Sequence, residues 1–114
     1  MSLNAKMITV DCAEPRVLAE WWAEALGTDI AHDFGGEFVI VGSVPPVLGF
    51  QRVPEPKQGK NRVHVDFHTE SRQAEVGRLV GLGATVLAEQ SAPGLTWTVL
   101  QDPEGNEFCV ADDT

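Results

Sequence analysis

The pattern of apolar and polar positions predicts two helices, each preceded by one short strand and followed by three. Residues 15–26 and 72–82 carry apolar side chains at helical spacing, whereas the remaining apolar segments are short and alternate with a period of two. The predicted strands span residues 7–12, 28–34, 37–41, 47–53, 60–69, 84–90, 95–100 and 107–111. The order strand, helix, strand, strand, strand therefore occurs twice.

Both predicted helices have recognisable start and stop signals. Pro15 suits a first helical turn, and Gly27 suits a left-handed cap that ends the first helix. Ser71 is a good N-cap for the second helix, and Gly83 is expected to end it. The expected buried side chains are Leu18, Trp21, Trp22, Ala25 and Leu26 in the first helix, and Val76, Leu79 and Val80 in the second.

The two halves of the chain also resemble each other locally. Residues 9–11 match residues 64–66 at an offset of 55, and residues 26–27 match residues 82–83 at an offset of 56. These matches lie in register with the repeated element order, which indicates an internal duplication. A polar segment rich in Pro and Gly lies between the halves. We therefore predict a single domain over residues 1–114, with module one at 6–54, a linker at 55–60 and module two at 61–112.

Composition narrows the class of protein. The chain has 114 residues, of which 43% are hydrophobic and 22% charged, as is typical of one soluble globular domain. No apolar run approaches the ~20 residues that span a bilayer, and no signal peptide is recognisable. The two cysteines, Cys12 and Cys109, are expected to be free thiols. These features predict a cytoplasmic protein without a membrane partner.

The net charge of −9 bears on possible ligands. No basic patch is available to contact phosphates, so nucleic acid is not an expected partner. The acidity has two interpretations that the sequence leaves open. It can serve solubility alone, or it can belong to an acidic cavity that attracts a cationic small molecule.

Four stretches, together with a turn of the pattern Asp-Pro-Glu-Gly-Asn at residues 102–106, resemble one known superfamily. The stretches are residues 22–27, 62–66, 82–86 and 97–108. They are similar to the vicinal-oxygen-chelate superfamily of glyoxalase I, bleomycin-resistance proteins and extradiol dioxygenases, and to its short bacterial glyoxalase-like members. The resemblance implies an α+β fold of two tandem βαβββ modules, whose curled sheets form a cup with the helices outside. It also implies a homodimer.

The same resemblance implies four positions at which metal-dependent members place their ligands. Carried over by register, these positions hold Thr9 (or Met7), Gln51, His64 and Cys109. Only His64 matches a usual ligand, because hard divalent ions prefer carboxylates and imidazoles. The glyoxalase I reaction and ring-cleaving dioxygenation are therefore not expected. A divalent metal ion held by His64 remains an alternative that the sequence does not favour.

Three polar side chains share one face of the predicted strand at 60–69, namely His64, Asp66 and His68. Same-face residues rise ~6.6 Å along a strand, so the two histidines lie ~13 Å apart and cannot easily bind one ion together. His64 and Asp66, with Cys109 from across the sheet, are a conceivable site, and a Cys–His pair would favour zinc or a softer ion. His64 and Asp66 also suit a general base with an orienting carboxylate, or only a polar pocket wall.

These observations support two main hypotheses for function. The first is a binding protein that holds a small, cationic, partly aromatic molecule in an acidic cup without the usual full metal site. The second is a lyase- or isomerase-type enzyme acting on a small carbonyl or hydroxylated compound, with His64 as metal ligand or base and Asp66 as the second catalytic candidate. A regulatory or scaffold role is a third. The expected ligand-binding residues are Thr9, Asp11, Gln51, His64, Asp66, Trp97 and Cys109.

Overall fold

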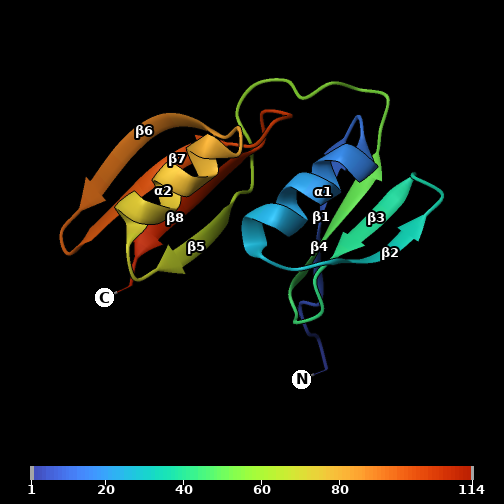
Figure 1. The fold of residues 1–114 in the computed structure, drawn as a ribbon, viewed down its shortest axis with the longest axis horizontal. Coiled ribbons are helices and arrows are strands. Elements are labelled where there is room, and N and C mark those ends of the chain that lie inside the picture. The colour runs from blue at the N-terminus through green and yellow to red at the C-terminus, as the bar shows by residue number, and fades with distance from the viewer. Residues whose placement is uncertain (1, 114) are drawn as a thin grey trace. The chain divides into compact units, whose positions relative to one another are not determined.

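The chain folds into two compact units, Met1–Pro56 and Lys57–Thr114, in a computed structural model that describes residues 2–113. Each unit contains one helix and one four-stranded sheet (Figure 1). The boundary between the units falls inside the segment that the sequence predicts as a linker. Residues 1 and 114 of the predicted single domain lie outside the described residues.

The order of elements confirms the predicted βαβββ modules. The first unit contains β1 (Met7–Cys12), α1 (Pro15–Leu26), β2 (Ile30–Phe34), β3 (Phe38–Val41) and β4 (Val47–Arg52). The second unit contains β5 (Val65–Thr69), α2 (Arg72–Gly81), β6 (Thr85–Ala92), β7 (Leu95–Gln101) and β8 (Glu107–Asp112).

Both sheets have the same mixed topology. The strand order is β1-β4-β3-β2 in the first sheet and β5-β8-β7-β6 in the second. The first and last strands of each module pair in parallel, and all other neighbours in the sheets are antiparallel. In each unit the helix packs on one face of its own sheet (Figure 1). We call the other face of each sheet the open face.

The core of the first unit lies between α1 and its sheet. Phe50 and Val39 are fully buried there and pair across β4 and β3. The helix begins at Pro15 and ends at Gly27, whose φ of 66° is left-handed, as predicted. The helix buries Pro15, Leu18, Ala19, Trp22, Ala23 and Ala25. The prediction was wrong for Leu26, which is 41% exposed at the last position of the helix, and Trp21 is only half-buried, because the buried stripe runs through Ala19, Trp22 and Ala23.

The second unit has an equivalent core beneath α2. Leu100 and Phe108 are buried, and the ring of Phe67 packs edge-on against Phe108 with centroids 6.0 Å apart. Leu79 of the helix is buried, as predicted, whereas the prediction was wrong for Val80, which is 46% exposed. The backbone N–H of Ala74 donates to the Ser71 hydroxyl, which confirms the predicted N-cap.

Except for β1, the predicted strands differ from the observed ones by one or two residues at an end, and the start of the strand predicted at 60–69 differs by five. The strand predicted at 60–69 begins only at Val65, which pairs with Phe108 of β8. Val63, predicted to lie on its apolar face, is 75% exposed. The strand predicted at 84–90 continues to Ala92, where it pairs with Leu95 across the tight turn.

The segment that enters the second unit is attached to the start of β8 by lysines. The Lys60 ammonium donates to a Glu107 carboxylate oxygen at 2.5 Å, and the Lys57 Nζ lies 4.0 Å from the other oxygen. The Glu107 side chain is only 9% exposed. The hydrogen bond from Lys60 holds the pKa of Glu107 below its usual value, and the backbone N–H of Asn61 adds to this effect.

A buried guanidinium connects α2 to its sheet. The Arg72 side chain is 10% exposed and donates to the Thr98 hydroxyl at 2.8 Å, to Glu89 at 3.0 Å and to Asp112 at 3.2 Å. The backbone N–H of Arg72 donates to the same Asp112 carboxylate at 2.8 Å. One carboxylate of the last strand therefore binds both the backbone and the side chain at the start of the helix.

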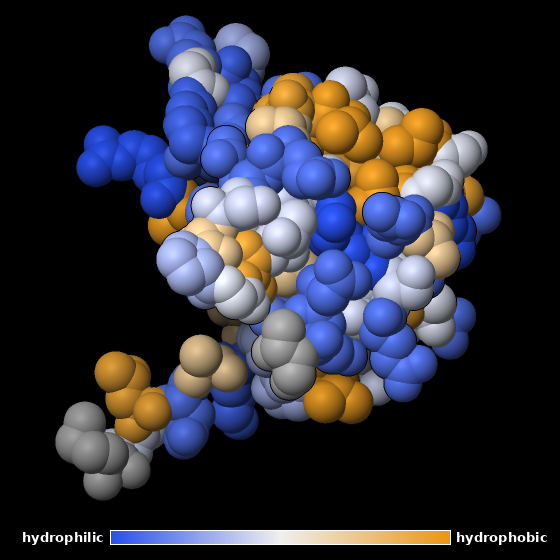
Figure 2. Space-filling view, turned by 90° about the vertical axis from the view of Figure 1, so that its left-hand side faces the viewer, coloured by the Kyte–Doolittle hydropathy of each residue, from blue (hydrophilic) through white to orange (hydrophobic). Residues whose placement is uncertain are grey.

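Seen from the left-hand side of Figure 1, the surface is mostly hydrophilic, with apolar patches among the polar residues (Figure 2). Within residues 2–113, neither helix has the length and apolar character needed to cross a membrane.

The Arg72 network leads to a prediction about stability. We expect Arg72→Ala to lower the urea midpoint of unfolding by roughly 1 M, because Thr98 and the helix start lose their buried donor. The matched control is Arg78→Ala on the same helix, since the Arg78 side chain is 43% exposed and its ion pair with Glu75 lies at the surface. Urea titrations followed by circular dichroism measure both, and equal losses in the two variants would contradict the prediction.

The Lys60–Glu107 pair predicts a dependence of stability on pH. The pKa of Glu107 is lower in the folded protein than its ordinary value of 4.5. Its ionised form therefore adds stability above pH 4.5, and this contribution is lost as the pH falls through the folded pKa. We expect Glu107→Gln to lose about 0.5–1 kcal/mol at pH 7 and to weaken less steeply in acid. Unfolding curves from pH 7 to pH 3 test this, with Glu104→Gln expected to follow the wild type.

Candidate functional site

The open face of the first sheet carries Thr9, Asp11 and Gln51, which are all exposed. The strand register pairs Asp11 with Gln51, so these two side chains lie next to each other on β1 and β4. Val10, between Thr9 and Asp11, points to the opposite face and pairs with the buried Phe50. The three predicted residues therefore share one surface.

The neighbour of Thr9 on the open face is a glycine. Thr9 pairs with Gly49, where a Cβ atom would lie only 2.9 Å from Met7 Sδ and from Phe38 Cζ. The Met7 and Phe38 side chains close over this position, so a larger residue there would require them to shift. Thr9 is therefore paired with a glycine, and Gln51 is paired with Asp11.

The open face of the second sheet carries the other predicted residues. Asp66 pairs with Cys109 across β5 and β8, and Trp97 of β7 pairs with Ala111. Thr98, which alternates with Trp97, is buried on the helix side. The sequence did not decide which face Trp97 occupies, and the strand register assigns this half-buried ring to the open face.

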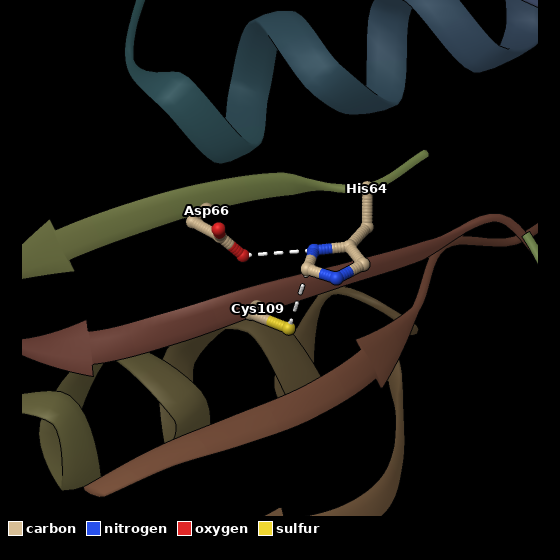
Figure 3. Close-up of side chains that lie close together, drawn as sticks. All are labelled: His64, Asp66 and Cys109. Atoms are coloured by element: carbon tan, nitrogen blue, oxygen red, sulfur yellow. Dashed lines mark hydrogen bonds and ion pairs between the residues drawn. The ribbon is translucent and has the colours of Figure 1, made fainter. Parts of the chain in front are cut away.

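Three side chains of the second unit meet on this face (Figure 3). The His64 Nδ1 atom lies 2.9 Å from the Asp66 Oδ1 atom and 3.8 Å from the Cys109 Sγ atom. All three potential ligand atoms lie within 4.8 Å of one another. His64 comes from the segment just before β5, Asp66 from β5 and Cys109 from the adjacent β8. The close approach of Asp66 and Cys109 follows from the parallel pairing of the two strands.

The other two histidines lie apart from this group. His68 is two positions beyond Asp66 on β5 and pairs with Ala111, and it does not belong to the group of potential ligands formed by described residues. From the rise per residue along a strand, the sequence predicts that His64 and His68 cannot easily bind one ion, and the structure agrees with this. His32 is exposed on β2, where its ring stacks on Phe34 with centroids 5.7 Å apart.

Cys109 is the buried member of the group, with 4% of its surface exposed. Burial, together with the negative charge and hydrogen bond of Asp66, raises the pKa of its thiol to about 11. At neutral pH the thiol is protonated, and a protonated thiol is a weak nucleophile. This agrees with the view that Cys109 is a small buried residue rather than a catalytic nucleophile.

Glu107 is a neighbour of the group that sequence reasoning did not identify. It lies two positions before Cys109 on β8, so both side chains project from the same face. Its negative charge contributes to the raised pKa of Cys109, and the Lys60 charge opposes it. The alternation along the strand would have revealed Glu107, but its pairing with lysines from the preceding segment depends on the folded chain.

The four positions that relatives use for a metal ion do not fit a hard divalent ion in this chain. Thr9 and Gln51 offer a hydroxyl and an amide, and no His, Cys, Asp or Glu group of three forms around them within residues 2–113. Such ions require several carboxylate or imidazole ligands. Any metal binding on the open faces must therefore use a different combination of ligand side chains.

Comparison with known proteins gives consistent results. A family model described as "Glyoxalase-like domain" matches residues 7–111. A glyoxalase/bleomycin resistance protein/dioxygenase family enzyme from Burkholderia phytofirmans PsJN superimposes with a TM-score of 0.81 at 16% identity, covering 96% of this chain and 98% of that one. Lactoylglutathione lyase from Agrobacterium tumefaciens superimposes with a TM-score of 0.74 at 16% identity, covering 98% and 94%.

A third structure, a glyoxalase-related enzyme from Fulvimarina pelagi, gives a TM-score of 0.75 at 16% identity and covers 96% of this chain and 88% of that one. No curated protein sequence matches the chain. At these identities the structural likeness shows the fold alone, whereas the family match extends over most of the sequence. The chain therefore belongs to the glyoxalase-like domain family of the vicinal-oxygen-chelate superfamily.

Proposed function

We propose that the protein binds a small organic molecule on the open faces of its sheets, with a preference for cationic, partly aromatic compounds. The observation that supports this proposal is the division of each sheet into two faces. One face is buried beneath a helix, and the other carries exposed or half-buried polar and aromatic side chains. Of the predicted ligand-binding residues, Thr9, Asp11, Gln51, Asp66 and Trp97 belong to the second kind of face, His64 lies beside it just before β5, and Cys109 is buried at its base.

Charge favours a cationic ligand. The chain carries a net charge of −9, and each open face presents an exposed aspartate, Asp11 on the first sheet and Asp66 on the second. The negative electrostatic potential of these charges concentrates cations near the protein surface. The Trp97 ring supplies an aromatic surface on the same face as Asp66, and a cation over such a ring is further stabilised.

The names of the similar structures include enzymes, but the residues here support binding more directly. Metal-dependent chemistry of the usual kind in this superfamily needs a full set of strong ligands, and Thr9 and Gln51 do not supply it. A polar, acidic surface without that set is suited to holding a ligand. We also expect a homodimer and a cytoplasmic location, and both stay predictions.

Removal of one open-face charge tests the proposal. We expect Asp11→Asn to weaken binding of a cationic aromatic compound about fivefold, because one unit charge at about 4 Å in water contributes about 1 kcal/mol. Isothermal titration calorimetry in the presence of a metal chelator measures this against a panel of cationic, neutral and anionic compounds of one size. The charge-matched control is Glu24→Gln on the outer surface of α1.

The expected pattern is a loss in Asp11→Asn and no change in Glu24→Gln, with the loss reduced at high salt. Equal losses in the two variants would mean that only the overall charge attracts the ligand. A flat response to all compounds in the panel would refute the proposal.

A second candidate function is general base catalysis by His64. It is favoured by the 2.9 Å contact between His64 Nδ1 and Asp66 Oδ1, which can orient the ring and leave Nε2 as the basic atom. The His64 side chain is 43% exposed, so a substrate can reach it. The corresponding reaction is removal of a proton next to the carbonyl group of a small hydroxylated compound.

Solvent exchange tests this candidate. We expect a small α-hydroxy ketone to take up deuterium from D2O in the presence of the wild-type protein, and His64→Asn to slow this by about 10²-fold or more. Nuclear magnetic resonance of the ketone measures the exchange. His68→Asn is the matched control, since it removes the histidine that lies on the open face of β5. Exchange at the rate of buffer alone, or equal loss in both variants, would exclude His64 as the base.

A further inference from the structure

We propose that His64, Asp66 and Cys109 form a binding site for one divalent cation of zinc type, held entirely within the second unit. The site shares His64 and Cys109 with the four positions inferred from relatives, but it adds Asp66 and needs no residue of the first unit. The inference goes beyond the proposed binding function and does not require an organic ligand. It rests on the distances, the donor chemistry and the local charges.

The distances between the ligand atoms match those around a tetrahedral zinc ion. With Zn–N near 2.0 Å, Zn–O near 2.1 Å and Zn–S near 2.3 Å, neighbouring nitrogen and oxygen ligands lie about 3.3 Å apart, and nitrogen and sulfur about 3.5 Å apart. The observed separations are 2.9 Å from His64 to Asp66 and 3.8 Å from His64 to Cys109. The remaining pair lies within 4.8 Å. Adjustments of less than about 1.5 Å, available to side-chain rotation, would seat all three atoms around one ion.

The donor set selects the kind of ion. It combines an imidazole, a carboxylate and a thiol, and a sulfur ligand together with a nitrogen ligand favours zinc over magnesium or calcium. Cys109 would bind metal as the thiolate, so the ion must displace the thiol proton, which is released to solvent. The bound set would then carry two negative charges, one from Asp66 and one from Cys109, and a doubly charged ion would neutralise both.

The surroundings leave the site accessible. The His64 and Asp66 side chains are 43% and 57% exposed, whereas Cys109 is buried at the base of the group. Glu107 stays bound to Lys60 and therefore does not compete as a further ligand. Three protein ligands leave a fourth position toward the open face for solvent or a small molecule, which is the usual composition of reactive zinc sites.

Other groups in the chain do not offer an equivalent set. His68 is on the same strand face but lies too far along β5 to bind the same ion. Cys12 is buried at the end of β1 in the first unit. The group of His64, Asp66 and Cys109 is the one set of three His, Cys, Asp or Glu ligands found within residues 2–113.

Metal titration of the full chain tests the inference. Protein stripped with chelator and kept reduced is titrated with zinc against a chromophoric chelator, and the bound metal is counted by elemental analysis. We expect one zinc per chain, binding weakened at least about tenfold in His64→Ala and Asp66→Asn, and loss of the stoichiometric site in Cys109→Ser. The matched controls are His68→Ala and Cys12→Ser, which remove the same ligand types elsewhere.

Cobalt provides a readout that does not depend on activity. Co²⁺ bound in place of zinc should show the intense near-ultraviolet band of a thiolate ligand and visible bands of tetrahedral intensity. We expect both in the wild type and in Cys12→Ser, and loss of the thiolate band in Cys109→Ser. The urea midpoint of each metal-free variant, which should stay near that of the wild type, confirms that a lost site does not reflect unfolding.

Three outcomes would overturn the inference. They are the absence of zinc binding at micromolar concentration, binding that Cys109→Ser leaves unchanged, and several weak ions per chain that His68→Ala removes as readily as His64→Ala does. The test separates this inference from the proposed binding function. Calorimetry with organic cations is performed with chelator present, so either result can fail while the other stands.

Discussion

The parallel pairing of the first and last strands of each module is the constraint on which the open faces depend. It brings residues from opposite ends of a module together, Asp11 beside Gln51 in the first unit and Asp66 beside Cys109 in the second. A parallel pair needs a long connection, and the helix and two intervening strands provide it. Each end of the module then contributes half of the surface that faces away from the helix.

The helices decide which face of each sheet is available for chemistry. Phe50 and Leu100 have no exposed surface because α1 and α2 cover the faces from which they project. Burial of such side chains contributes about 1.5–3 kcal/mol each, so the apolar residues of every strand are confined to that side. The alternating residues must then project from the open face, and in this chain many of them are polar.

The two modules share the same register between their first and last strands, but the side chains at corresponding positions differ. Asp11 and Asp66 occupy equivalent positions, whereas the position opposite holds Gln51 in one module and Cys109 in the other. Thr9 corresponds to His64 in the aligned stretches. An aspartate beside an amide is suited to hydrogen bonding. An aspartate beside a thiol and an imidazole has the donor types of a soft-metal site, so duplication followed by substitution has given the two open faces different chemistry.

The sequence by itself determined the elements, their order and the face of most side chains, because alternation and helical spacing are local properties of the chain. It indicated the family by resemblance. It also showed that Thr9 and Gln51, at two of the four ligand positions of relatives, are not usual metal ligands. Only the tertiary structure decided that β5 begins at Val65, that Trp97 lies on the open face and that Lys60 binds Glu107. It also decided that His64, Asp66 and Cys109 meet, since contacts between residues 45 positions apart depend on strand register and not on local pattern.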